Sequence, residues 1–215
     1  MGKYSKGILG SFNGKVGTVI GSTWNGIDYM KSLPKKSSKA PSVKQMIQRD
    51  KFALATGFLQ PISALVSLGF KNGLSGQTGF NAATSYVLAN AITGDHPDFG
   101  IDYSKVLISK GALSIPSNVQ ISSTIAGQIQ FIWADNSSSG LAAATDKAIL
   151  LVINPETLQA QSTTEGAERS STGQVWDVID FQGQEVHVWI AFISADGKTL
   201  SSSVYAGSLT VAEAD

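Results

Sequence analysis

The chain has 215 residues, of which 42% are hydrophobic and 15% charged, and its 16 basic and 16 acidic residues give a net charge of zero. It contains no cysteine, which excludes disulfides, thiolate metal sites and cysteine nucleophiles. The length suits one large or two small domains with room for a buried core.

The zero net charge hides a polarity along the chain. Residues 1–51 hold ten Lys and Arg against two Asp, which is +8, whereas residues 52–215 hold six basic against fourteen acidic residues, which is −8. A basic arm on an acidic body can attract nucleic acid, an acidic membrane surface or another copy of the chain. The first residues contain no apolar run of signal-peptide length, so we expect no Sec-dependent export. Cytoplasmic synthesis is expected, and an extracellular filament or a virion would need another route.

The N-terminal third begins with a predicted antiparallel meander. Its strands are expected at about 7–12, 15–24 and 27–33. Two Asn-Gly pairs, at 13–14 and 25–26, each favour a two-residue hairpin turn, because both turn positions need positive φ. A basic stretch between two prolines, PKKSSKAP, follows. Residues 1–41 are therefore predicted to be a basic, glycine-rich β-hairpin arm and linker.

Residues 42–103 are predicted to be a helical segment. Ser42 and Gln45 match a capping box that would begin a helix at about 43–59. Further helices are expected at 61–68 and 79–92, with a turn-rich connector at 94–103. The stretch 52–70 carries no charge and approaches the length of a membrane span. Gln60 and Pro61 interrupt it, so we expect two buried helices and no membrane partner.

From about residue 105 the pattern changes to short strands. They are expected at 105–110, 119–125, 128–134, 147–153, 157–163, 174–180, 185–193 and 201–211. This number and spacing fit an immunoglobulin or fibronectin III-like sandwich over residues 104–215. The alternation in 185–193 predicts one core-facing side that includes Val186 and Ile190, and a polar side with Glu185, His187 and Trp189. Trp133 is expected to anchor the core.

The predicted fold class is therefore α+β, with an N-terminal β-hairpin meander and short helices followed by an all-β immunoglobulin/fibronectin III-like sandwich. Four segments also carry a family pattern in order: GILGSFNGKVGTVIGSTWNGIDYMKSLPKKSSKAPSVKQMIQRDKFALATGFL, GFNAATSYVLANAITG, DYSKVLISKGAL and WIAFISADGKTLSSSVYAGSLTV. In these the chain resembles an uncharacterised bacterial family, catalogued as a domain of unknown function. The resemblance implies that the arm, the helices and the β domain form one unit, and it implies no activity.

No motif predicts an enzyme or a cofactor. GSFNGKV differs from a phosphate-binding loop, since Leu9 stands where glycine is needed and Val16 follows Lys15. A loop cluster could offer metal ligands but matches no known spacing; it comprises Asp95, His96, Asp98 and Asp102. His187 is the second of only two histidines, and no GxSxG is present. We therefore expect no catalytic, metal or cofactor site and no small-molecule substrate.

The favoured hypothesis is a structural, self-assembling protein, a subunit of a filament or another homopolymer, whose basic β arm binds neighbouring copies. Exposed strand edges and apolar side chains would supply that contact. The assembly residues it names are Tyr4, Phe12, Lys15, Trp24, Tyr29, Lys31, Lys35 and Lys36.

Two alternatives from other classes stay open. Trp176 and Trp189, if exposed, could stack on sugars in a phage or cell-surface adhesion module. The arm could instead package nucleic acid, although no helix-turn-helix, RNP or KH motif is present.

Overall fold

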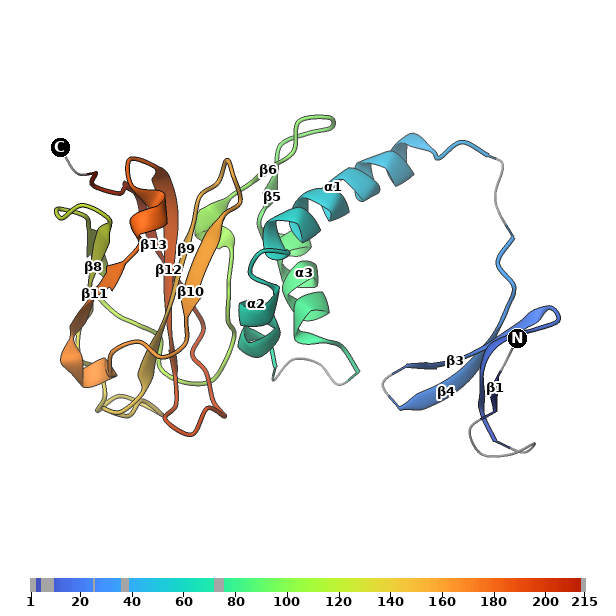
Figure 1. The fold of residues 1–215 in the computed structure, drawn as a ribbon, viewed down its shortest axis with the longest axis horizontal. Coiled ribbons are helices and arrows are strands. Elements are labelled where there is room, and N and C mark those ends of the chain that lie inside the picture. Colours follow the sequence, from blue (N-terminus) through green and yellow to red (C-terminus); the bar gives the residue numbers. More distant parts are fainter. Residues whose placement is uncertain (1–2, 5–9, 25, 36–38, 72–75, 214–215) are drawn as a thin grey trace. The chain divides into compact units, whose positions relative to one another are not determined.

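The computed structural model describes residues 3–4, 10–24, 26–35, 39–71 and 76–213. The chain divides into two compact units, Met1–Ser42 and Val43–Asp215. Figure 1 shows the meander of the first unit, and the helices and β-sheets of the second. The change from helix to strand near residue 104 therefore falls inside the second unit.

The first unit is an antiparallel sheet in the order β1-β2-β3-β4. Its strands are β1 (Lys3–Tyr4), β2 (Phe12–Val16), β3 (Val19–Trp24) and β4 (Ile27–Ser32). The second predicted turn is confirmed, because Trp24 pairs with Ile27 and Gly26 has a φ of +80°. Asn25 lies outside the described residues.

The first predicted turn is wrong. Asn13 and Gly14 lie inside β2, and the hairpin turns four residues later, at Gly17 and Thr18, between the paired Val16 and Val19. Gly17 supplies the positive φ that this turn needs, at +60°. The register that results pairs Gly14 with Gly21, so the fit between strands overrides the local preference of the Asn-Gly pair.

The second unit begins with three helices: α1 (Val43–Leu59), α2 (Ser63–Gly69) and α3 (Gly79–Asn90). All three were predicted, α1 with the same bounds. Thr78 caps α3, since its hydroxyl accepts a hydrogen bond from the Asn81 backbone N–H at 3.2 Å. Within the described part of the chain, no single helix could cross a membrane; α1 and α2 together reach the length and composition but are bent by 94°.

A β-sandwich follows, as predicted. One sheet has the order β10-β9-β12-β13 and the other β11-β8-β7. The first is built from β9 (Lys147–Ile153), β10 (Ala160–Thr163), β12 (Glu185–Ile193) and β13 (Val204–Thr210). The second is built from β7 (Gln120–Ser122), β8 (Gln128–Ile132) and β11 (Gly173–Asp177). A small hairpin of β5 (Ile92–Thr93) and β6 (Gly100–Ile101) connects α3 to this sandwich.

The strand predicted at 105–110 is wrong. The chain there forms a short 3-10 turn, η1 (Tyr103–Lys105), and then an extended segment. Side chains and isolated backbone contacts satisfy this segment in place of a regular strand partner; for example, the Ser203 N–H donates to the Ser109 carbonyl at 3.1 Å. The Ile108 N–H donates to the Ser203 hydroxyl at 2.9 Å, and the Ser109 hydroxyl donates to the Ser201 carbonyl at 2.8 Å.

Two hydrophobic cores make the second unit a three-layer structure. One core lies between the two sheets and contains Trp133, Val188 and Ile190, which confirms Trp133 as a core anchor. The other lies between the four-stranded sheet and the helices and contains Phe58 and Trp189. Figure 1 shows α2 and α3 beside this sheet, with the three-stranded sheet on its other side.

The polar side predicted for β12 is therefore wrong. Trp189 is completely buried, and His187 is half-buried. The helices cover this side of the sheet and turn an apparently amphipathic strand into one buried on both faces. The helical segment is thus a layer of the second unit that shares a core with the sandwich.

Candidate functional site

The strand register of the meander gathers basic and aromatic side chains on one face. Ile20 pairs with both Lys15 and Lys31, and directly paired residues share a face. Tyr29 and Trp24 lie on the same face, because residues an even number of positions apart along a strand point the same way. The Lys31 Nζ lies 5.8 Å from the centre of the Tyr29 ring. We call this the basic face.

The opposite face carries apolar side chains beside Thr23 and Asp28, which pair with each other. Val16 pairs with Val19, and Gly21 pairs with Met30. A Cβ on Gly21 would lie 2.7 Å from the Phe12 ring, so the ring covers the glycine. Met30 is 71% exposed and Val16 is 44% exposed. We call this the apolar face: Phe12, Val16, Val19 and Met30.

The structure thus separates the predicted assembly residues. Lys15, Trp24, Tyr29 and Lys31 lie on the basic face, whereas Phe12 lies on the apolar face. The Tyr4 backbone pairs with Phe12, and its side chain lies outside what the structure describes. Lys35 is exposed after β4, and Lys36 lies outside the described residues.

The meander buries almost nothing of its own. Among its described residues, Gly21 alone is buried. Ile27 is 64% exposed and Trp24 is 47% exposed. Residues 1–42 hold seven Lys against one Asp, a charge of +6, and residues 43–215 hold nine basic against fifteen acidic residues, which is −6. The unit is a small basic sheet with large apolar side chains in contact with solvent.

A half-buried aromatic cluster surrounds His187. Its Nδ1 lies 2.6 Å from the Tyr205 hydroxyl, and Tyr103 stacks on its ring with centroids 4.0 Å apart. The Trp189 ring centroid lies 6.2 Å away. Burial lowers the pKa of His187, and the nearby Glu185 opposes that shift.

This cluster joins layers of the second unit. Trp189 donates its Nε1–H to the Val106 carbonyl at 3.2 Å, and its ring lies 6.3 Å from that of Phe58 in α1. Burial also raises the pKa of the Tyr103 hydroxyl. The contacts of His187 with Tyr205 and Tyr103 are all within the chain, and they favour a structural role for this histidine.

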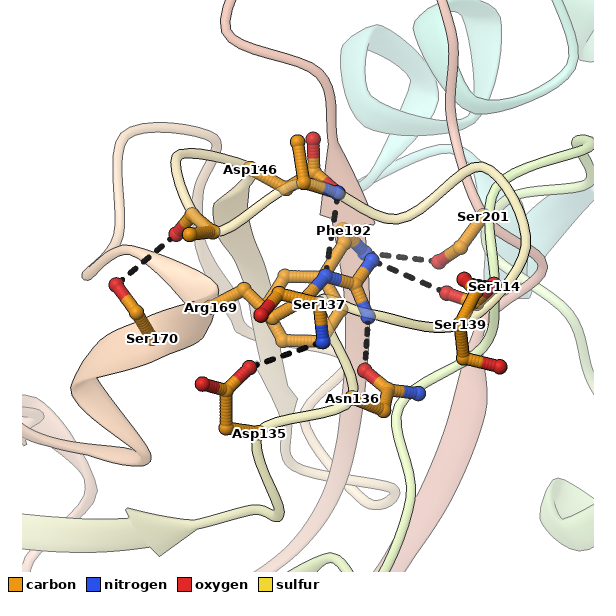
Figure 2. Close-up of polar contacts among 12 residues, drawn as sticks. Ser114, Asp135, Asn136, Ser137, Ser139, Asp146, Arg169, Ser170, Phe192 and Ser201 are labelled. Carbon is orange, nitrogen blue, oxygen red and sulfur yellow. Dashed lines mark hydrogen bonds and ion pairs between the residues drawn. The ribbon is translucent and has the colours of Figure 1, made fainter.

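A buried arginine ties together the loops at one end of the sandwich. Figure 2 shows Arg169 at the centre of these contacts. Its Nε donates to Asp146 at 3.1 Å, and its terminal nitrogens donate to the Asn136 side chain at 2.5 Å and the Ser114 carbonyl at 3.1 Å. The guanidinium lies 3.8 Å from the centre of the Phe192 ring.

The sequence analysis did not identify Arg169 as a buried structural residue. Its side chain is completely buried, with a relative accessibility of 0%. Burial lowers the pKa of the guanidinium, and Asp146 opposes that shift. A signal was present, because Arg169 is the only Lys or Arg in the range 148–197. A lone cation within a β domain suggests a specific buried partner.

The candidate metal ligands of the connector at 94–103 do not gather into one site. His96 lies 3.3 Å from Asp50 in α1. The Asp102 carboxylate accepts a hydrogen bond from the Ser104 hydroxyl at 2.5 Å, forms an ion pair with Lys105 at 2.9 Å, and accepts from the Ser104 backbone N–H at 3.1 Å. These contacts, the Ser104 hydroxyl first among them, hold the pKa of its carboxyl below the usual value. In the part of the chain that the structure describes, no three His, Asp or Glu side chains form a group that could hold a metal.

The tryptophans named for glycan binding do not share an exposed face. Trp189 is buried against the helices. Trp176 is half-buried, with its ring centroid 6.3 Å from that of Phe131 in the other core. The pair of exposed aromatic rings that this alternative requires is absent at these two positions.

The sequence profile of a family of unknown function (DUF6266) matches residues 11–207. The chain belongs to this family. The DUF6266 match runs from the meander into β13, so the family pattern includes parts of both units. Among solved structures, the chain is similar to the fibronectin type III domain of the human collagen alpha-1(XX) chain. That similarity has 16% identity and a TM-score of 0.37, and it covers 47% of this chain and 88% of the collagen domain. No curated protein matches the chain.

Proposed function

We propose that the protein is a structural subunit that self-assembles through its N-terminal meander. The observation that carries this proposal is the nearly complete exposure of the sheet, in which Gly21 is the only buried residue described. Small sheets need a covered apolar face to be stable in water. A contact that covers the apolar face would therefore stabilise the meander and join two molecules.

Charge favours a second copy as the partner. The meander unit carries +6 and the remainder of the same chain carries −6, so the two units of different copies attract each other at long range. The low charge content of 15% leaves much neutral surface for close contact. We expect salt to weaken assembly only in part, because buried apolar contacts are not screened.

A contact between different surfaces of two copies is head-to-tail. Such contacts form a ring if the rotation between subunits closes and a filament if it does not. The edge strand β4 carries Lys31 and Asp28, and charges on an edge strand oppose pairing with another strand. The apolar face is therefore the better candidate for the contact.

The test compares the full chain with residues 43–215, which retain both hydrophobic cores. Sedimentation velocity and negative-stain microscopy should show assemblies of the full chain and monomers of the folded shorter chain. A full chain that stays monomeric at high concentration rejects self-assembly. A shorter chain that still assembles rejects the role of the meander.

The basic face supports a second candidate, a nucleic-acid packaging protein. Lysines beside Tyr29 and Trp24 offer phosphate contacts and base stacking on one surface. A mobility-shift assay with single-stranded DNA at low salt tests it. Binding that is lost in Lys15→Glu with Lys31→Glu would support packaging, and no shift of the full chain would exclude it.

A further inference from the structure

The outer face of the three-stranded sheet in the second unit has an uncovered apolar surface. In β8, Ile129 and Phe131 are buried in the core, so Gln130 and Ile132 point outward by alternation. The register pairs Val175 of β11 with Gln130. Ile132 is 43% exposed and Val175 is 54% exposed.

Two hollows connect these side chains into one surface. A hollow of about 400 Å³ is lined by residues that include Gln130, Ile132 and Val175. A smaller one of about 30 Å³ is lined by Gln130, Val175 and Ile125. Ile125 is 61% exposed. We call this surface the outer patch: Ile125, Gln130, Ile132 and Val175.

The charge around the outer patch has one sign. The ranges 111–146 and 170–197 supply all three strands of this sheet and contain no Lys or Arg. Asp177, at the end of β11, and Asp180 are exposed. The ranges that supply this sheet therefore offer a basic partner acidic groups and no Lys or Arg.

We propose that the outer patch is the docking site for the apolar face of the meander of a second copy. This inference rests on the proposed function and adds the surface that receives the meander. Both surfaces present branched or flexible apolar side chains, including Val16 and Met30 on one and Ile132 and Val175 on the other. The +6 charge of the meander unit complements the acidic groups beside the patch.

The geometry of this contact is head-to-tail, since the meander and the outer patch are different surfaces of one chain. Each molecule then has one donor and one acceptor surface, and the chain can polymerise. The two surfaces can be inactivated separately. Met30→Asp places a carboxylate on the meander's apolar face, and Val175→Lys places a cation in the centre of the patch.

The experiment mixes these two full-length variants. Each alone should be monomeric, with association weakened about tenfold or more, as expected for a charge placed in a buried apolar contact. A mixture in equal amounts should form a dimer, because Val175→Lys retains an intact meander and Met30→Asp retains an intact patch. Leu141→Lys, at a residue that is 65% exposed in another loop, is the matched control and should assemble as the natural chain does.

Each other outcome overturns the proposal in a distinguishable way. If Val175→Lys assembles normally, the meander binds elsewhere and self-assembly stands. If each variant is monomeric and their mixture also stays monomeric, the contact does not join the meander to the outer patch. If the natural chain is itself monomeric, the proposed function fails together with this docking site. Circular dichroism of each variant confirms that loss of assembly is not loss of fold.

Discussion

Replacing Arg169 with methionine should strongly destabilise the second unit. Methionine keeps much of the side-chain length but leaves the Asp146 carboxylate, which is 2% exposed, without its cation. The Ala143 N–H still donates to that carboxylate at 2.9 Å, so part of the site survives. Breaking a buried ion pair by removing one partner costs about 3–5 kcal/mol. For a chain of this size, that corresponds to a fall in Tm of about 6–20 °C.

Thermal and urea unfolding measure this effect, and an exposed ion pair provides the control. Lys147 and Glu165 form an ion pair whose side chains are 41% and 72% exposed. Lys147→Met should cost less than about 1 kcal/mol, because water already solvates both charges. The double variant Arg169→Met with Asp146→Asn should be more stable than Arg169→Met alone, because no buried charge is left unpaired. A single variant as stable as the Lys147 control would refute this account of the arginine.

Acidification from about pH 7.5 to about pH 5.5 should destabilise the chain through His187, because burial lowers its pKa from 6.5 and the unfolded state then binds more protons. In urea titrations, His187→Gln should lose less stability over that range. Trp189→Ala should cost about 3–5 kcal/mol in the same assay, since this buried ring joins helices and sheet. Gly21→Ala should disrupt assembly while the second unit unfolds at its usual temperature, because a Cβ there would lie 2.0 Å from the Phe12 carbonyl oxygen.

Helix α1 and strands β9 and β12 could be predicted because their signals are local. A capping residue and an apolar stripe mark Val43–Leu59, and unbroken apolar or alternating runs mark Lys147–Ile153 and Glu185–Ile193. The first hairpin could not be predicted in this way. Its turn lies at Gly17, and the register that goes with it places the Phe12 ring over Gly21 across the strands. A local turn preference contains no information about that pairing.

The wrong prediction of a polar side for β12 arises from contacts between segments that are far apart in the sequence. Nothing within β12 indicates that the helices of residues 43–90 cover its apparently polar side. The candidate assembly surface was partly predictable from the charge polarity. The separation of Lys15 and Lys31 from Val16 and Met30 required the register, since a shift of one residue exchanges the faces.

Cross-linking between isotopically distinct copies tests the central claim most directly. A photoreactive residue at position 30 would be placed in chains labelled with ¹⁵N and mixed with unlabelled natural chains after disassembly. The account predicts cross-links from position 30 that join labelled to unlabelled chains and end at the outer patch, near Ile132 and Val175. Cross-links confined to a single chain, or none from position 30, would contradict assembly through the meander.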